Sequence, residues 1–286
     1  MTAETELSID VYVTPMRPFA SGPAPKAGFE PVWSPMSSTL IAGERNAVLV
    51  DALLAFDQAD ALADWVEGHG KHLTAILITH GHSDHWLGLA RLLERFPDAR
   101  GLASAEVLER ARFEGTDARM KEYWRSRFPG EIPADPVLPD LFEEDSFELD
   151  GHELKIIDIG QGDTDHTSIV YAASIGAVVC GDVVYNQVHM MTAETDAASR
   201  GAWVDSLDAI AALDPTTVVA GHKRFGAPDT PDTIAQSRQY IQDFTRIVAE
   251  QEKVEDIVAG MMRLHGDRDN PWVLWYCAEQ AVAKRG

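Results

Sequence analysis

Residues 79–88 read THGHSDHWLG, a stretch that places four side chains of metal-binding type within six positions. These are His80, His82, Asp84 and His85. At the end of an extended strand, residues two apart point the same way, so His80 and His82 are expected to bind one metal from a single face. The chain is then expected to turn, which would bring Asp84 and His85 toward a second metal. This pattern predicts a metal centre that begins where a strand ends.

Three further residues of ligand type follow segments that are typical of strands or turns. His166 lies in the glycine- and aspartate-rich turn GQGDTDHT, Asp182 ends AVVCGD, and His222 ends TTVVAGH. Proteins of the α/β class place their chemistry at the carboxyl ends of strands. Each residue alone could have a structural role, such as that of a buried hydrogen-bonding histidine. Together they would supply the missing ligands.

The order H-x-H-x-D-H, then His, then Asp, then His resembles the metallo-β-lactamase superfamily over roughly residues 39–222. The resemblance implies a pair of bound metal ions. It assigns His80, His82 and His166 to the first metal, Asp84, His85 and His222 to the second, and Asp182 to a bridge between them. It also implies that Asp51, at the end of the segment AVLVD, supports the cluster from outside the ligand set.

The donor types are imidazole and carboxylate, without thiolate. Such donors suit zinc and also iron, manganese or cobalt, so zinc is expected chiefly because of its availability. A pair of divalent ions would bridge a water molecule and lower its pKa from about 16 toward neutrality. The expected cofactor is therefore two divalent ions, with zinc favoured.

Departures from the family pattern narrow the expected chemistry. Class B β-lactamases carry a cysteine where this chain has Asp182, and Cys180 is expected to pack in the core. Flavodiiron proteins carry a glutamate where His82 stands. What remains is similar to the glyoxalase II, N-acyl homoserine lactone lactonase and arylesterase branch. Tyr185, three residues after Asp182, matches a tyrosine that binds the substrate in the lactonases, with burial in the core as the alternative.

The resemblance implies hydrolysis of a carboxylic ester, lactone or thioester by a metal-bridging hydroxide. Tyr185 would stabilise the tetrahedral oxyanion, and Asp84 would relay a proton to the departing oxygen. Two alternatives remain open. One is an oxidoreductase similar to the persulfide dioxygenases, with a single iron, and the other is a non-catalytic binding protein that keeps the metals as a structural staple.

Composition argues against several classes of partner. The formal charge is -22, from 46 acidic and 24 basic residues, which opposes binding to nucleic acid or to an anionic membrane. The chain begins without a signal-like segment, has no apolar stretch long enough to span a membrane, and contains two cysteines, too few for a disulfide framework. We expect a soluble cytoplasmic enzyme that acts on a small molecule. Whether it forms a homodimer stays open.

The whole chain, residues 1–286, is expected to form one α/β domain, a four-layer αββα sandwich. Strand-like segments alternate with turns and helical patterns in both halves. Residues 104–142 change from a charged helical pattern to a proline-rich one, which predicts a lid-like insertion. Residues 231–286 are expected to form an almost wholly helical tail.

Overall fold

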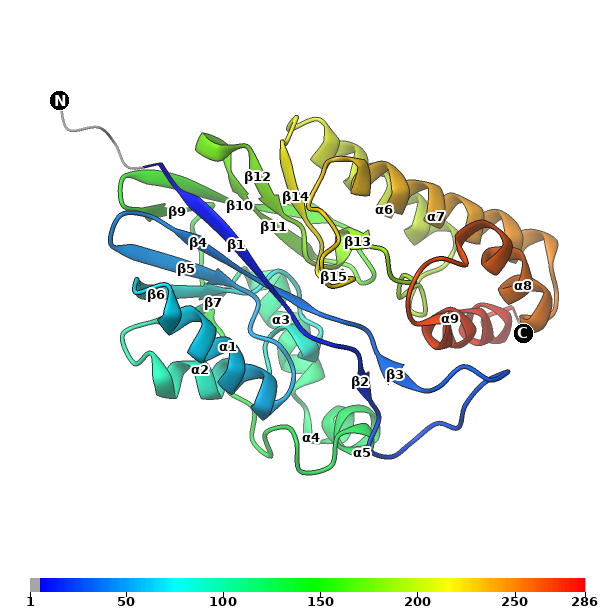
Figure 1. Ribbon diagram of the computed structural model, residues 1–286. Coiled ribbons are helices and arrows are strands. Elements are labelled where there is room, and N and C mark those ends of the chain that lie inside the picture. Colours follow the sequence, from blue (N-terminus) through cyan, green and yellow to red (C-terminus); the bar gives the residue numbers. More distant parts are fainter. Residues whose placement is uncertain (1–5, 286) are drawn as a thin grey trace.

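Two β-sheets packed face to face form the centre of the computed structural model, which describes residues 6–285 (Figure 1). The first sheet has the strand order β1 (Ser8–Val13), β4 (Ser37–Ala42), β5 (Asn46–Val50), β6 (His72–Leu77), β7 (Arg100–Ala103) and β8 (Asp140–Leu141). The second has the order β14 (Thr217–Val219), β12 (Ala177–Val179), β11 (Thr167–Ala172), β10 (His152–Gly160) and β9 (Ser146–Leu149). Two small pairs join β2 (Arg17–Pro18) to β3 (Val32–Trp33) and β13 (Tyr185–Asn186) to β15 (His222–Lys223).

The side chains of the central strands are buried on both faces of the sheet. In β5, Val48 and Val50 belong to the apolar cluster between the two sheets. Ala47 and Leu49, which alternate with them, belong to the cluster beneath the outer helices. Strands covered on both faces are therefore almost continuously apolar, as the segment AVLV is.

Helices cover the outer face of each sheet (Figure 1). Those on the side of the first sheet are α1 (Phe56–Gly68) and α2 (Leu89–Arg95), and those on the side of the second are α6 (Ala197–Ala211) and α7 (Asp232–Glu250). The expected αββα fold class is confirmed. No helix within residues 6–285 is long and apolar enough to cross a membrane.

The insertion and the tail consist mainly of helices, as expected. The insertion contains α3 (Ala105–Glu114), α4 (Asp117–Arg119), the π-helical turn η2 (Met120–Trp124) and α5 (Arg125–Arg127). Its proline-rich end leads into β8, which extends the first sheet parallel to β7. After α7, the tail continues through α8 (Val254–His265) and α9 (Pro271–Ala283). Single helical turns occur at η1 (Ser83–His85), η3 (Ala173–Ile175) and η4 (Gly181–Val183).

Backbone hydrogen bonds tie together the loops at the ends of the strands. Thr79, just after β6 of the first sheet, accepts a bond of 2.7 Å from the backbone N–H of Ser168 in β11 of the second. His85 accepts one of 2.6 Å from Ala52, and the N–H of Gly88 donates to Leu53 at 2.9 Å. The loop that follows β6 is therefore fixed to both sheets.

Gly88 offers a direct test of this close packing. A Cβ atom at this position would lie 2.0 Å from the carbonyl oxygen of Ala52, so Gly88→Ala must shift the backbone. We expect a loss of about 1–3 kcal/mol in the free energy of unfolding, measured by urea denaturation. Gly68→Ala is the matched control, because no atom lies within 4 Å of the added carbon. Equal stability of the two variants would contradict the proposed packing constraint.

Candidate metal centre

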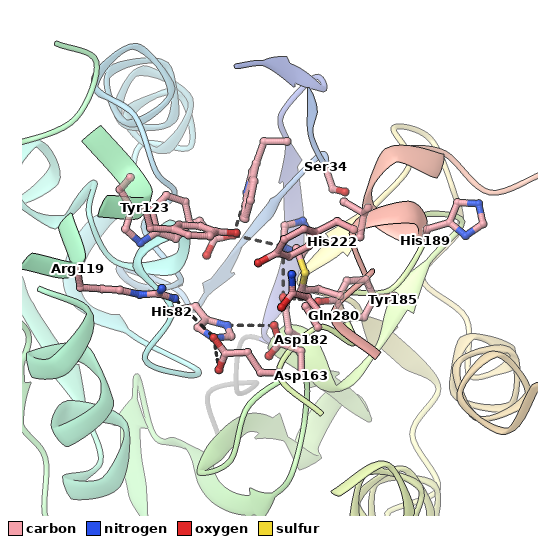
Figure 2. A pocket seen from close by; sticks show the side chains of 18 of the residues that line it. Ser34, His82, Arg119, Tyr123, Asp163, Asp182, Tyr185, His189, His222 and Gln280 are labelled. Atoms are coloured by element: carbon pink, nitrogen blue, oxygen red, sulfur yellow. Dashed lines mark hydrogen bonds and ion pairs between the residues drawn. The ribbon is translucent and has the colours of Figure 1, made fainter. Parts of the chain in front are cut away.

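Six of the seven predicted metal-binding residues come together where strands of the two sheets end. His80 and His82 lie in the loop after β6, and the neighbouring turn η1 carries two more of the residues. Asp182 lies in η4 after β12, and His222 begins β15. Of the predicted residues, those that fall into candidate metal-binding groups are His80, His82, Asp84, His85, Asp182 and His222. Segments far apart in the sequence thus bring their polar side chains together, as Figure 2 shows for His82, Asp182 and His222.

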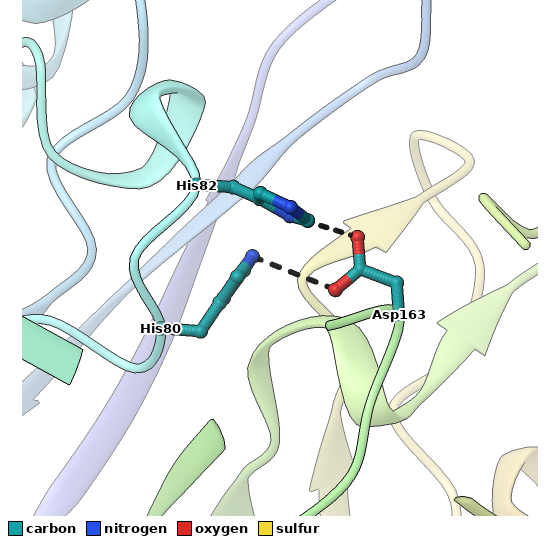
Figure 3. Close-up of side chains that lie close together, drawn as sticks. All are labelled: His80, His82 and Asp163. Atoms are coloured by element: carbon teal, nitrogen blue, oxygen red, sulfur yellow. Dashed lines mark ion pairs between the residues drawn. The ribbon is translucent and has the colours of Figure 1, made fainter. Parts of the chain in front are cut away.

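The first group contains His80, His82 and Asp163, whose potential donor atoms lie within 4.8 Å of one another (Figure 3). His82 Nδ1 is 3.0 Å from one carboxylate oxygen of Asp163, and His80 Nε2 is 3.9 Å from the other. Asp163 is 2% exposed and lies in the turn between β10 and β11. The group therefore presents two imidazoles and one carboxylate to the same small volume.

The second group contains Asp84, His85 and His222. Asp84 Oδ2 lies 3.7 Å from His85 Nε2 and 3.3 Å from His222 Nε2. Asp182 stands between the two groups, because its oxygens lie 3.4 Å from His85 Nε2, 3.3 Å from His222 Nε2 and 4.0 Å from His80 Nε2. This is the position that a carboxylate shared by two cations would need.

Outer partners hold the imidazoles so that Nε2 of His85 and His222 faces the centre. His85 Nδ1 lies 2.8 Å from Asp51, which also accepts a bond of 2.9 Å from the backbone N–H of Thr79. His222 Nδ1 lies 3.0 Å from the carbonyl oxygen of Pro35 and donates to it. Asp51 adopts a left-handed φ of 65°, which costs a non-glycine residue free energy and is tolerated where the surroundings enforce it. The expected supporting contact of Asp51 is thus present in the structure.

Four buried atoms at the centre have no hydrogen-bond partner within the described residues. They are His80 Nε2, His85 Nε2, Asp163 Oδ1 and Asp182 Oδ1. A buried polar atom that is left unpaired costs about 1–3 kcal/mol, so four of them in one place need another explanation. Imidazole nitrogen and carboxylate oxygen are the donors that divalent transition ions use. These residues therefore fit a metal site.

The protonation equilibria at the centre are strongly perturbed. Burial raises the pKa of Asp163 to about 6, although nearby His82 opposes the rise. Burial lowers the pKa of His80 well below its ordinary range, and neighbouring His85 lowers it further. For His222 burial works in the same direction, but Asp182 outweighs it and the pKa rises to about 10. Perturbations in both directions within one cluster are typical of functional sites.

His166 lies apart from the other six predicted residues. Its side chain is exposed, and it belongs to none of the candidate groups within the described residues. The backbone at His166 is left-handed, with φ of 54°, immediately before β11 begins at Thr167. Asp163, three residues earlier in the same turn, reaches the centre instead. The turn contains aspartates and a histidine, and the side chains of both residue types bind metal ions.

Tyr185 lies against the centre. Its hydroxyl group donates a hydrogen bond of 2.7 Å to Asp182 Oδ2, and its side chain is 1% exposed. The parallel pairing of β13 with β15 puts Tyr185 directly beside His222, and the two rings stack with centroids 5.4 Å apart. Burial and neighbouring carboxylates raise the pKa of Tyr185 well above its ordinary value, so the hydroxyl keeps its proton.

A pocket of about 390 Å³ opens onto the centre (Figure 2). Arg119, Tyr123 and Trp124 of the insertion line it, together with Tyr276 and Lys284 of the tail region. The walls therefore combine aromatic surface with two cationic side chains. Chain segments outside the sandwich therefore form much of the lining of the pocket through which a ligand would reach the metal-binding residues.

Trp33 connects this pocket with the metal-binding residues. Its indole N–H donates a hydrogen bond of 3.0 Å to Asp84 Oδ2, and its ring packs edge-on against Trp124 with centroids 5.1 Å apart. Trp33 thus contacts both the aromatic wall of the pocket and the carboxylate of Asp84.

Comparisons with known proteins agree with this geometry. The chain is 27% identical to a hydroxyacylglutathione hydrolase from Chromohalobacter salexigens over 77% of this chain and 90% of the relative. It is 28% identical to one from Glaesserella parasuis serovar 5, of which it spans about half the length, 47%. A metallo-beta-lactamase family protein from Thermus thermophilus superposes with a TM-score of 0.64, at 20% identity, over 96% of this chain and 94% of that one.

A metallo-beta-lactamase from Pontibacter korlensis superposes with a TM-score of 0.60 at 17% identity, over 85% of this chain and 98% of that one. At such identities the likeness supports the fold alone. The family model of the metallo-beta-lactamase superfamily matches residues 32–222, the part of the chain that carries all the candidate ligands. The sandwich, the clustered histidines and aspartates and this match lead to one conclusion, that the chain belongs to the metallo-beta-lactamase superfamily.

Proposed function

We propose that this protein is a metal-dependent hydrolase that cleaves a carboxylic ester, lactone or thioester of a small molecule. The observation that carries the proposal is a set of buried donor atoms that face one another beside a pocket and have no hydrogen-bond partner among residues 6–285. Thioesters come first among the substrates to test, since the relatives are named hydroxyacylglutathione hydrolases. Cytoplasmic location and a homodimer stay predictions.

In this proposal the protein holds two divalent ions. His80 and His82 would contribute to the first position, Asp84, His85 and His222 would hold the second, and Asp182 would contribute to both. Bound there, zinc or a similar divalent ion would supply hydroxide at neutral pH and polarise the carbonyl group. The candidate groups that contain an aspartate each combine it with two histidines, which supports this assignment.

The remaining chemistry is assigned to side chains of the chain itself. The Tyr185 hydroxyl, which faces the centre and keeps its proton, would donate a hydrogen bond to the oxyanion of the tetrahedral intermediate. Asp84 would relay a proton to the leaving group, as the sequence suggested. Trp33 holds one oxygen of Asp84 through its indole N–H, which would keep the carboxylate oriented during that transfer.

An iron-dependent oxidoreductase is the second candidate, and one observation favours it. His80, His82 and Asp163 form a set of two histidines and one carboxylate, which is the ligand set of many non-haem iron oxygenases. The second complete group beside it is what a hydrolase needs and a single-iron oxidoreductase does not. The hydrolase is therefore the preferred function.

Removal of the metal should abolish hydrolysis. After chelation and dialysis, we expect turnover of thioesters, esters and lactones to fall to the background rate, and addition of zinc or manganese to restore it, because the metal supplies the nucleophile. Chromogenic substrates of the three classes provide the measurement. One iron per chain together with oxygen consumption on a persulfide would identify the oxidoreductase. A metal-dependent melting temperature without turnover of any substrate would identify a non-catalytic protein in which the metals have only a structural role.

Tyr185→Phe should lower kcat by about 10²–10³-fold without changing the metal content, as expected for the loss of an oxyanion donor. Kinetics on the best substrate and elemental analysis of the same preparation provide the two measurements. Tyr171→Phe is the matched control, because its hydroxyl group bonds only weakly, at 3.4 Å, to the carbonyl oxygen of Leu213. If Tyr185→Phe instead loses metal, the hydroxyl group acts by positioning Asp182.

A further inference from the structure

We infer that Asp163 is a ligand of the first metal position, and that the protein therefore offers two positions with the same donor set of two imidazoles and one carboxylate, joined by Asp182. This inference rests on the proposed function only in that both require bound metal ions. It names a ligand that the sequence pattern did not indicate. It also predicts how the relative affinity of the centre for different metal ions differs from that of a position with three histidines.

The placement of Asp163 is that of a ligand. One oxygen lies 3.0 Å from His82 Nδ1, and the other lies 3.9 Å from His80 Nε2 (Figure 3). That second oxygen and His80 Nε2 both lack a hydrogen-bond partner among residues 6–285. A cation between these atoms would satisfy both of them at once.

The carboxylate of Asp163 differs from those of other aspartates in the same region. Asp158, in β10, accepts a bond of 3.0 Å from the backbone N–H of Gly160, where the register of the strand shifts. Asp165 is exposed and accepts a bond of 3.2 Å from the hydroxyl group of Thr164. Asp163 is buried and directed at two imidazoles, which is an arrangement that turn formation does not require.

The two positions become equivalent in chemistry once Asp163 is included. His80, His82 and Asp163 would hold one ion, and the second group of two histidines and Asp84 would hold the other. Asp84, Asp163 and Asp182 together carry three negative charges, which would offset most of the charge of two divalent ions. With a third histidine in place of Asp163, one charge fewer would be offset.

The donor set also affects which metals bind. Carboxylate oxygen is a harder donor than imidazole nitrogen, so replacing one imidazole by a carboxylate favours manganese and iron relative to zinc. We therefore expect this centre to prefer zinc over manganese less strongly than a position with three histidines would. The expectation concerns relative affinity and does not depend on which substrate is hydrolysed.

The experiment measures metal bound per chain in the purified protein after equilibration with limiting metal. Wild type should retain two ions, and Asp163→Ala should retain one. The affinity of the first position for metal should fall by more than about 10–100-fold, which is the loss typical of mutating a residue outside the ligand set. Asp165→Asn and His166→Ala are matched controls from the same turn and should retain two. Circular dichroism checks that each variant is folded.

Asp163→His provides a second variant that keeps a ligand at the position. It should retain two ions, and competition between zinc and manganese should shift toward zinc by about tenfold or more, because an imidazole replaces a carboxylate. An unchanged competition ratio, or loss of metal from His166→Ala with full retention in Asp163→Ala, would overturn the inference. Wild type with no bound metal would overturn both this inference and the proposed function. Wild type with two ions and no turnover would overturn only the function.

Discussion

Three carboxylates are buried among four imidazoles in the interior, and the rest of the structure has to accommodate this arrangement. Asp84, Asp163 and Asp182 are each at most 3% exposed. Burying charged groups costs free energy unless opposite charge or hydrogen bonds compensate. Imidazoles supply part of the compensation here, yet atoms that face the centre have no partner within the described part of the chain. The folded state is therefore expected to be coupled to cation binding.

Glycines near the centre leave room for these side chains, because a Cβ atom at the same positions would clash with neighbouring atoms. A Cβ atom at Gly221 would lie 2.2 Å from an oxygen of Asp182. One at Gly181, which has a left-handed φ of 50°, would lie 2.4 Å from the hydroxyl oxygen of Thr79. Gly221 thus lets the loop after β14 approach the loop after β12, and Gly181 lets the loop after β12 approach Thr79, just after β6. The position of the Asp182 carboxylate follows from these close approaches.

Local sequence was sufficient to predict the sandwich and most of the cluster. Alternating or continuous apolar runs identify the strands, and H-x-H-x-D-H at a strand end identifies four of the residues. The choice between Asp163 and His166 could not be made in this way, because both residue types bind metals. Their places depend on a left-handed residue at position 166 and on the burial of the turn against the other sheet. Such features arise from packing between segments distant in sequence.

The pocket depends still more on distant segments. The ring centroid of Tyr123 in the insertion lies 4.6 Å from Cζ of Arg119 and 3.7 Å from Cζ of Arg127, and Tyr123 lines the pocket together with residues of the tail. Trp33, from the N-terminal region, contacts both this wall and Asp84. A ligand that displaces the aromatic wall would therefore also disturb a carboxylate of the centre. Esters, lactones and thioesters share a carbonyl group, so under the proposed function the walls of this pocket would contribute to the choice among them.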